Sequence, residues 1–484
     1  MILKIYILPC CLYLILFSLK AQSYLNYTNI WYFGWGAGVD FSSGNPVALT
    51  NGAMNTPEGC ASICDKNGNL LFYTNGNAVW NKNHDTLTNG FALLGGRSST
   101  QSSIIVPHPG NTSIYYIFTI DDGDNGLKTT LRYSEVDMSM QNGLGEIRKK
   151  NILLLTKVDE KLTAVVHCNG HDIWVIAHKW NSNAFCAYLI TAAGVDSIPV
   201  VSNVGISQYY QAGYMKVSSN GKKIAMIVTE LKDQLFDFDN SKGIVSNPIT
   251  LGNTNSFDYG VEFSPEATKL YIGSQTNNLI QYDLQSGDSI SINASATYLN
   301  LDSRVLALQL ARDNKIYCAQ LYQDNQYLGV INNPNAKAAD CNFQSHGVFL
   351  SWRNSSMGLP NFITSYFDTS HAACTDSLIG HKKNCNEIFI PNAFSPNGDG
   401  ENDTLLVRAN CLKDMEFIVY NRWGEKIFET KNIKVGWDGK PAAFIFGEGQ
   451  KEKEEMNTGI YTYFLSGILD GKRIERKGTV SLIR

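Results

Sequence analysis

The sequence predicts an all-β protein, a β-propeller of about seven blades followed by a small immunoglobulin-like β-sandwich. The first observation is a turn dipeptide followed by a hydrophobic β run, which recurs about every fifty residues along the main body. The second is composition: Gly (41), Tyr (24), Phe (22) and Trp (8) are abundant and charged residues make up 17%, which suits strands and tight turns. The third is that the last hundred residues leave the repeat and carry hairpin patterns of their own. At roughly 150 residues per domain, 484 residues accommodate this organisation.

Residues 1–21 predict a secretory signal peptide. Lys4 supplies a positive start, residues 5–19 are mostly apolar, and Ala21 is a small residue suited to cleavage. A membrane anchor is the alternative, but this apolar run is shorter than the roughly 20 residues needed to span a bilayer. We therefore expect export through the Sec translocon. No later segment is long and apolar enough to cross a membrane.

The charge excludes one class of function. The chain has 40 Lys+Arg and 44 Asp+Glu, a net charge of −4, and loss of Lys4 and Lys20 with the signal peptide makes it −6. Nucleic-acid binding relies on a basic excess that neutralises phosphates. We therefore expect no nucleic-acid partner.

Residues 24–370 contain the repeat and predict the propeller. With 347 residues, seven blades would take about 50 residues each, as expected for four short strands and their turns, while six to eight blades stay open. One further step of 46 residues predicts a seventh β run at Phe362. The six β runs begin at Leu70, Ile114, Ile173, Ile224, Leu270 and Ile316, with spacings of 44, 59, 51, 46 and 46 residues.

Closure of the ring needs a further element, because an open ring leaves sheet edges exposed. Too little chain follows Phe362 to make a full blade. Residues 31–34 and 38–41 have strand character and precede the first full repeat. We expect this N-terminal segment to complete the last blade; a leading hairpin outside the ring is the alternative.

Several sequence segments of the main body resemble those of a group of propeller proteins secreted by Bacteroidetes. This resemblance supports the fold more than any activity. The residues that carry the resemblance are Glu58-Gly-Cys-Ala-Ser-Ile, Leu71-Phe-Tyr-Thr-Asn-Gly, Val79-Trp-Asn and Ser98-Ser-Thr-Gln-Ser-Ser-Ile-Ile-Val-Pro.

The candidate chemical groups of the propeller are few. His167, His171 and His178 form one histidine cluster, which could hold a metal only with a ligand from another blade; a hairpin turn is the favoured interpretation. The acidic loop at residues 121–126 could hold calcium or be a solvated loop. The pairs Tyr115-Tyr116 and Tyr209-Tyr210 could stack on sugars or line inter-blade cores. We assign no catalytic, cofactor-binding or metal residue.

After a polar linker at residues 371–386, residues 387–484 predict a separate β domain. Residues 415–428 and 460–484 each contain a hairpin pattern, and Asp470-Gly471 in the second suits a type I′ turn. Two hairpins and a preceding strand are the size of a small β-sandwich.

This segment resembles the gliding-motility-associated C-terminal domain, the type B sorting domain of the type IX secretion system. The resemblance implies export to the outer-membrane surface or the medium, with the type IX secretion machinery as partner. One departure is an insertion at residues 444–457, which we expect to be a solvated loop. The motif residues are Pro391, Asn392, Phe394, Pro396, Asn397, Gly398, Asp399, Gly400, Asn402, Asp403, Asn421, Arg422, Trp423, Gly424, Trp437, Asp438 and Gly439, together with Gly459-Ile-Tyr-Thr-Tyr and Lys477-Gly-Thr-Val-Ser-Leu-Ile-Arg.

Calcium is the one cofactor that the motif leaves open. Asn397, Asp399, Asn402 and Asp403 offer hard oxygen ligands, but the spacing does not match an EF-hand loop. Asx residues with glycine also form tight turns without any metal, and we favour the turn.

The cysteines number eleven, of which nine remain after the signal peptide is removed, so at least one thiol is free or paired between chains. Cys60 and Cys64 lie in one predicted strand and are therefore too far apart to bond, at about 13 Å. Cys385 and Cys411 flank the first strands of the C-terminal domain and are the candidate disulfide.

Two classes of function remain for the propeller. One is a non-catalytic platform that binds glycan or protein outside the cell. The alternative is a polysaccharide-active hydrolase or lyase whose acids converge at the propeller axis, or a structural part of the gliding or envelope machinery. Because we find no catalytic motif, we favour the binding platform.

Overall fold

The computed structural model divides the chain into two compact units, Met1–Thr375 and Asp376–Arg484. The expected signal peptide and linker lie outside the described residues. The structure describes residues 24–123, 129–252, 257–276, 278–285, 287–321, 324–368, 388–397, 403–409, 412–433, 435–441, 455–469 and 472–483.

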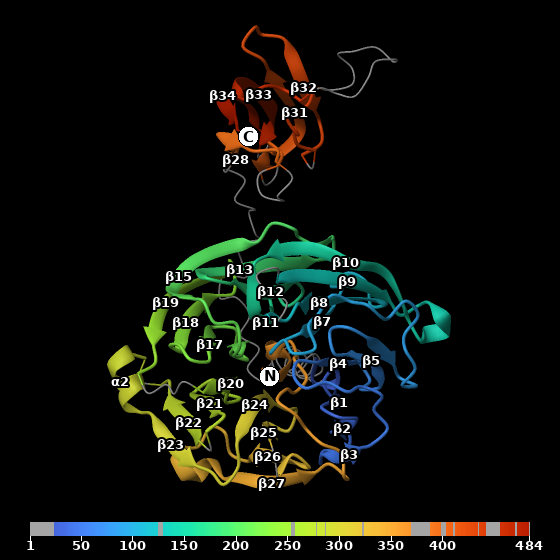
Figure 1. The fold of residues 1–484 in the computed structure, drawn as a ribbon, viewed down its shortest axis with the longest axis vertical. Helices are drawn as coiled ribbons and strands as arrows, with labels where there is room; N and C mark the ends of the chain where they lie inside the picture. The colour runs from blue at the N-terminus through green and yellow to red at the C-terminus, as the bar shows by residue number, and fades with distance from the viewer. Residues whose placement is uncertain are drawn as a thin grey trace, which may run out of the picture. The chain divides into compact units, whose positions relative to one another are not determined.

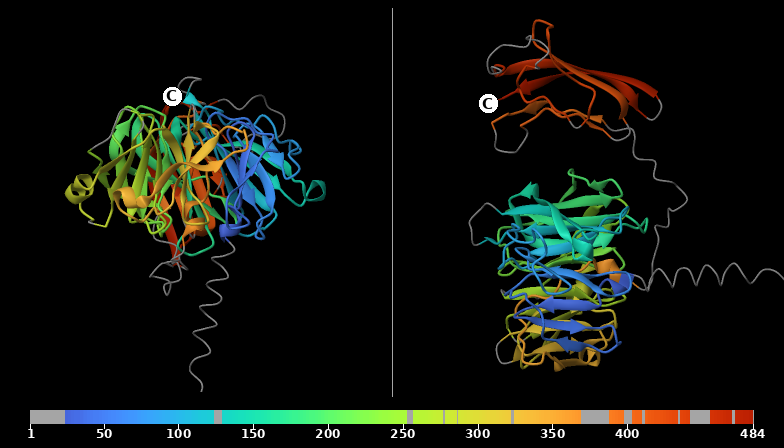
Figure 2. Two further views of the ribbon diagram at one scale, coloured as in Figure 1. Left: turned by 90° about the horizontal axis from the view of Figure 1, so that it is seen from below. Right: turned by 90° about the vertical axis from the view of Figure 1, so that its right-hand side faces the viewer.

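The described part of the first unit contains seven antiparallel sheets arranged as blades around a common centre, which is a β-propeller (Figure 1). Figure 2 shows this ring from the side. The first three sheets are β1 (Ile30–Phe33), β2 (Ala37–Asp40) and β3 (Val47–Leu49); β4 (Ala61–Cys64), β5 (Leu70–Thr74) and β6 (Val79–Asn81); and β7 (Ser103–Pro107), β8 (Ile114–Ile120), β9 (Thr130–Asp137) and β10 (Glu146–Thr156).

The other four sheets follow in chain order. The fourth and fifth are β11 (Val158–Val166), β12 (Ile173–Lys179), β13 (Ser182–Thr191), β14 (Gly194–Val195) and β15 (Val200–Gln208); and β16 (Met215–Val217), β17 (Lys223–Met226), β18 (Gln234–Asp239) and β19 (Ile244–Thr250). The sixth and seventh are β20 (Asp258–Phe263), β21 (Lys269–Ser274), β22 (Asn278–Asp283) and β23 (Thr297–Asn300); and β24 (Val305–Leu310), β25 (Ile316–Gln320), β26 (Tyr327–Ile331) and β27 (Phe343–Phe349). Short helical segments are η2 (Gln141–Gly143), α2 (Ser289–Ala294), η4 (Ala338–Cys341) and η5 (Thr364–Phe367).

The fifty-residue repeat corresponds to the blades. Each of the six predicted β runs begins in the second strand of its own sheet, namely β5, β8, β12, β17, β21 and β25. The turn before Ile224 shows why the pattern works: Gly221 adopts φ +69° and its N–H donates to Ser218 O, so that Val217 and Ile224 pair across β16 and β17. The predicted run at Phe362 is wrong, because this buried residue belongs to no strand and precedes η5.

Closure of the ring differs from the expectation. The N-terminal strands β1–β2–β3 form a sheet by themselves, and the seventh sheet is complete with four strands. The C-terminal contribution is residues 354–367, joined to the first sheet by one bridge between Trp35 and Asn354. The N-terminal segment therefore belongs to the ring, as expected, but it supplies a blade of its own instead of finishing the last one.

Residues 354–367 contact the inner strands of several blades. The side chain of Asn361 donates to the carbonyls of Ser103 and Leu162, and Thr364 Oγ1 donates to Ala164 O. At the end of the segment, Ser365 Oγ accepts the Val166 N–H at 2.8 Å. Because Ser355 Oγ also donates to Gln320 O of the seventh sheet and Asn354 bridges to Trp35 beside the first, this single short segment ties together blades from both ends of the chain.

The second unit contains a five-stranded sheet and a two-stranded sheet, the small β domain that was expected. Both predicted hairpins are present, β31–β32 and β33–β34, while the Asp470-Gly471 turn lies outside the described residues. Phe394, Trp437, Leu465 and Val480 are among the buried residues of its core. The strands are β28 (Ile388–Phe389), β29 (Ala393–Phe394), β30 (Arg408–Ala409), β31 (Leu412–Tyr420), β32 (Lys426–Thr430), β33 (Gly459–Leu469) and β34 (Lys472–Leu482), and the larger sheet has the order β29-β34-β33-β31-β32.

Candidate binding face and sorting domain

A buried charged network occupies the start of β11, an inner strand of the fourth blade. Asp159, Lys161 and His178 are all fully buried, with His178 Nδ1 2.7 Å and Lys161 Nζ 3.8 Å from Asp159 Oδ2. Lys161 Nζ also donates to the carbonyl of Gln211 at 2.8 Å, and burial lowers the pKa of Lys161. Buried charges are tolerated when they are paired and hydrogen-bonded in this way.

Glu160 connects the fourth blade to the third blade and to the chain that joins the second blade to the third. Its Oε2 accepts the N–H and the hydroxyl of Thr100, and its Oε1 accepts the Gly123 N–H at 3.1 Å. Burial raises the pKa of Glu160, while these hydrogen bonds oppose the rise. The Glu160 carboxylate thus joins neighbouring blades, whereas Asp159 is paired within its own blade by Lys161 and His178.

Asp233 and Asp258 form a buried carboxyl pair between the fifth and sixth blades. Burial and the neighbouring Asp258 raise the pKa of Asp233 well above its ordinary value. The protonated form is therefore favoured in the folded state, and the stability from this pair is present at low pH and lost as pH rises through the raised pKa.

We predict that Asp233→Asn raises the melting temperature at pH 8, because the ionised carboxyl of the unfolded wild type is disfavoured on burial and the neutral amide avoids this cost. A gain of roughly 2–4 °C would correspond to about 1 kcal/mol. The gain should shrink at pH 4, where the carboxyl of the unfolded wild type is also largely protonated and folding therefore costs little. Asp237→Asn is the control: Lys223 lies 2.7 Å from Asp237, so its loss should not stabilise the protein at pH 8. Equal melting temperatures of wild type and Asp233→Asn at pH 8 would contradict the prediction.

The three histidines do not converge on one site. His167 Nδ1 accepts the Asn169 N–H at 2.9 Å within the β11–β12 turn, whereas His178 lies at the other end of β12 beside Asp159. The turn interpretation is the one that the geometry fits. Among the described residues, no group of three or more His, Cys, Asp or Glu side chains could hold a metal ion.

Both candidate calcium loops fall partly outside the described residues. In the first, Asp121 Oδ2 accepts the N–H and hydroxyl of Thr130, while residues 124–128 are not described. In the second, Asn397 and Asp403 are described but Gly398, Asp399, Gly400 and Asn402 are not. Calcium stays a prediction at both.

The end of the propeller that carries residues 34–36 and 350–356, here called the upper face, presents an exposed aromatic cluster. The cluster consists of the exposed Phe349 and Trp352 and the half-buried Tyr327. Tyr327 and Phe349 pair across β26 and β27 with ring centres 5.2 Å apart, and Phe349 meets Trp352 edge-on at 5.2 Å. Trp352 is 76% exposed, so its indole ring faces solvent.

The backbone at Trp352 is held in an unusual conformation. Its φ is +67°, which is strained for a bulky residue and costs on the order of 1–3 kcal/mol. The flanking hydrogen bonds impose it: Arg353 Nη2 donates to Thr50 O, and the Trp35 N–H donates to Asn354 O. A strained backbone that displays a tryptophan to water is typical of a functional site.

Polar groups stand beside these rings. His346, on the same strand as Phe349, packs edge-on against Tyr327 at 4.5 Å, and its Nε2 lies 3.0 Å from Asp324 Oδ1. Trp35 is also exposed and joins the same stretch of chain through Asn354. The patch therefore combines flat apolar rings with hydrogen-bonding donors and acceptors.

The paired tyrosines predicted from the sequence fall in two classes. Tyr115 and Tyr116 on β8 are buried in the core, which is the inter-blade role. Tyr209 is exposed immediately after β15, while Tyr210 packs against the core of the fourth and fifth blades. The aromatic cluster at Trp352 went unpredicted, because Phe349-Leu-Ser-Trp352 carries no signal that distinguishes exposed from buried rings.

Several motif residues of the second unit build its core. Strand β29 runs parallel to β34, with Phe394 opposite Leu482. The centre of the Phe394 ring lies 5.2 Å from that of the Trp437 ring. Trp437 is fully buried; its Nε1 donates to Lys440 O and its backbone pairs with Leu405. The Asn392 carbonyl accepts the Ser481 N–H, while Pro391 and Pro396 flank this strand.

Other motif residues make turns. Asn421 Oδ1 accepts the N–H groups of Trp423 and Glu425, and Gly424 adopts φ +80°. Asp438 Oδ1 accepts the Lys440 N–H, and the Gly439 carbonyl accepts the Met456 N–H. In contrast to the buried Trp437, Trp423 is 74% exposed.

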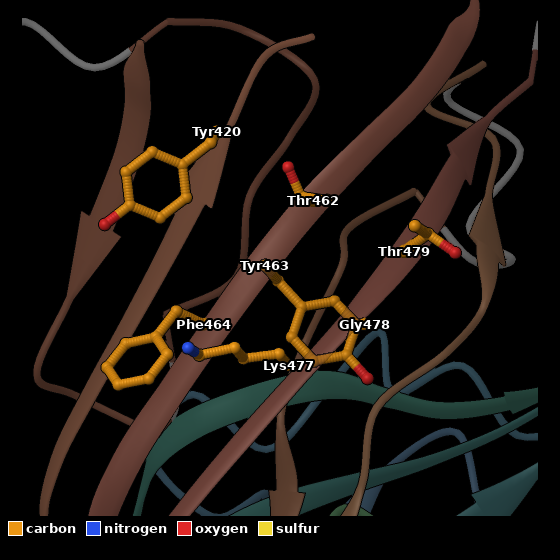
Figure 3. A pocket seen from close by; sticks show the side chains of 7 residues that line it. All are labelled: Tyr420, Thr462, Tyr463, Phe464, Lys477, Gly478 and Thr479. Carbon is orange, nitrogen blue, oxygen red and sulfur yellow. The ribbon is translucent and has the colours of Figure 1, made fainter. Parts of the chain in front are cut away.

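The outer face of the five-stranded sheet carries an open depression of 590 Å³ (Figure 3). The side chain of Lys477 lies over the Phe464 ring, with Nζ 5.6 Å from its centre. The lining residues come from β31, β33 and β34 and are Tyr420, Thr462, Tyr463, Phe464, Lys477, Gly478 and Thr479.

The cysteine predictions are resolved in part. Cys60 and Cys64 are not bonded to each other, as expected; both are buried free thiols, and so are Cys186, Cys318 and Cys341. Cys385 and Cys411 lie outside the described residues, so their disulfide stays a prediction.

The comparison with protein families explains the second unit. Residues 388–482 match the CHU_C type IX secretion signal domain. This match confirms the resemblance seen in the sequence, and it shows that the protein is exported to the cell surface or secreted by the type IX route. Within the described residues, no helix has the length and apolar character required to cross a bilayer.

Solved structures similar to this chain include other propellers. A candidate 6-phosphogluconolactonase from Bacteroides uniformis is 13% identical, with 68% of this chain and 98% of that chain covered and a TM-score of 0.43. The Cps50 (Swd1) β-propeller domain of Myceliophteria thermophila is 11% identical, covering 78% and 97%, with a TM-score of 0.32. PorZ, a surface component of the type IX secretion system of Porphyromonas gingivalis, is 10% identical, covering 93% and 73%, with a TM-score of 0.29. No curated protein matches the sequence.

Proposed function

Because residues 388–482 form a type IX secretion signal domain, we propose that the propeller is the part delivered outside the cell, where it acts as a carbohydrate-binding platform. In this proposal, residues 1–21 direct passage through the Sec translocon, and the sorting domain then engages the type IX secretion machinery. The observation that carries the binding role is the rigid, exposed aromatic cluster of Tyr327, Phe349 and Trp352 on the upper face.

The chemistry of the patch favours a sugar ligand. One face of a pyranose ring is lined by C–H groups and packs on an aromatic ring, while its hydroxyls need both donors and acceptors. The exposed Trp352 indole offers such a ring, and the His346–Asp324 pair offers a donor and an acceptor beside it, His346 on β27 and Asp324 just before β26. Binding sites for small polar ligands commonly combine aromatic walls with a few placed polar groups.

Rigidity of the patch supports the same function. Phe349 and Tyr327 are fixed by strand pairing, and the hydrogen bonds around Arg353 and Asn354 fix the turn that carries Trp352. A ligand that binds to rings already held in place loses less side-chain entropy, which favours affinity.

We predict that Trp352→Ala lowers affinity for bacterial and plant polysaccharides at least tenfold. The measurement is a pull-down of the purified mature chain with a panel of insoluble polysaccharides, followed by titration with soluble oligosaccharides. Tyr298→Ala is the matched control, because Tyr298 is also an exposed aromatic residue but belongs to β23. Its binding should equal that of the wild type.

Two results would overturn this proposal. Absence of binding to every polysaccharide in the panel would point to a protein ligand or to a structural role in the envelope. Release of reducing sugar ends in the same reactions would instead identify a polysaccharide-active enzyme.

A further inference from the structure

The β31–β32 turn of the sorting domain presents an arginine and a tryptophan to solvent. Trp423 is 74% exposed, and the guanidinium carbon of Arg422 lies 4.8 Å from the centre of its indole system. This stacked pair projects from a hairpin tip and not from the core of the domain.

The turn does not need either side chain for its geometry. Asn421 Oδ1 accepts the Trp423 and Glu425 N–H groups, Asn421 Nδ2 donates to Glu425 Oε2, and the Gly424 N–H donates to Asn421 O. The positive φ of Gly424 completes the turn. The two outer residues of the motif, Asn421 and Gly424, therefore determine the conformation of the turn. The side chains of the two inner residues, Arg422 and Trp423, project from it.

The other aromatic residues of the motif behave differently. Phe394 and Trp437 are buried against each other and stabilise the domain. Leaving a tryptophan in water forfeits the stabilisation that burial of its large apolar surface would bring. Tryptophan and arginine are also the residues most enriched among those that dominate the energy of protein interfaces.

We propose that the Asn421–Glu425 turn is the surface by which the type IX secretion machinery recognises this domain. Trp423 enters an apolar pocket of the machinery, and Arg422 pairs with a carboxylate at the rim of that pocket. The carboxylate of Glu425 already accepts a hydrogen bond from Asn421. Arg422 therefore gives the tip of the turn its positive charge, and a complementary partner surface is acidic. This proposal is independent of the ligand proposed for the propeller.

The test is delivery of the full-length chain in a bacterium that carries a type IX secretion system. Surface and periplasmic pools are separated by fractionation and by protease accessibility of intact cells. We expect Trp423→Ala to reduce the surface pool at least tenfold with accumulation in the periplasm. The charge reversal Arg422→Glu should reduce it severalfold, and Trp423→Phe should retain part of the delivery.

The same domain offers a matched control. Phe389 on β28 is 57% exposed and has the Arg408 guanidinium 5.9 Å from its ring centre, but neither residue is on the β31–β32 turn. Phe389→Ala and Arg408→Ala should be delivered like the wild type. Unchanged melting of purified Trp423→Ala and Arg422→Glu separates loss of recognition from loss of folding.

Three results would overturn the proposal. The first is normal delivery of Trp423→Ala. The second is an equal loss of delivery in Phe389→Ala, which would assign the effect to exposed aromatic residues in general. The third is a lowered melting temperature in both Trp423→Ala and Arg422→Glu that accounts for their loss of surface delivery. The turn would then have a structural role only.

Discussion

Removal of residues 477–484 should abolish surface delivery and leave the protein in the periplasm. Residues 477–482 form the second half of β34, which pairs with β33 from Phe464 to Gly459 and with β29 at Ala393 and Phe394. Val480 and Leu482 are buried in the core of the domain. The truncation therefore removes the strand that joins β29 to the rest of the sheet.

The expected loss is at least tenfold in the surface pool, measured by protease accessibility of intact cells. Trp352→Ala is the control, because it changes the propeller and leaves the sorting domain whole; it should reach the surface like the wild type. Normal delivery of the truncated chain would show that the type IX signal does not require an intact five-stranded sheet.

The blade repeat was predictable from the sequence because its signals are local. A turn such as Asn220-Gly221 before the β run at Ile224 determines both where strands pair and in which register, with no help from distant residues. The same holds for the β31–β32 and β33–β34 hairpins. In each case, neighbouring segments supply the hydrogen bonds that the pattern implies.

Closure of the ring was not predictable, because it depends on contacts between distant segments. Residues 354–367 have no strand periodicity; contacts such as those of Asn361 with the carbonyls of Ser103 and Leu162 hold them in place. The charged run Asp159-Glu160-Lys161 shows the same limit: charged residues are ordinarily exposed, yet these are buried because residues distant in the sequence provide partners.

The type of residue in the candidate binding site, aromatic, was predictable from the sequence, but its position in the chain was not. Aromatic residues that could stack on sugars were expected at Tyr115-Tyr116 and Tyr209-Tyr210, and among the paired tyrosines only Tyr209 is exposed. Exposure of Trp352 arises from its turn, which is set by bonds from Arg353 and Asn354 to a loop some 300 residues away in the chain. Local sequence carries no record of such a contact.

Deletion of residues 24–43 should prevent the propeller from folding. The deletion removes β1 and β2, and with them Trp31, Phe33 and Phe41, which are buried in the largest core cluster. Trp31 alone packs against Phe41 at 4.8 Å and against Tyr317 of the seventh sheet at 5.9 Å. Loss of one such aromatic side chain costs about 3–5 kcal/mol.

The sum for these three side chains, about 9–15 kcal/mol, is comparable to the total stability of a typical domain, about 5–15 kcal/mol, and the newly exposed sheet edge adds to the loss. We therefore expect insoluble protein or the absence of a cooperative melting transition for the deletion. The point variant Trp31→Ala tests the same contacts within an intact chain and should melt roughly 5–15 °C below the wild type. Ile290→Ala, at an exposed residue of α2, should melt like the wild type. An unchanged melting temperature for the deletion would mean that β1 and β2 lie outside the cooperative ring, because a blade that contributes its core residues cannot be removed without exposing those of its neighbours.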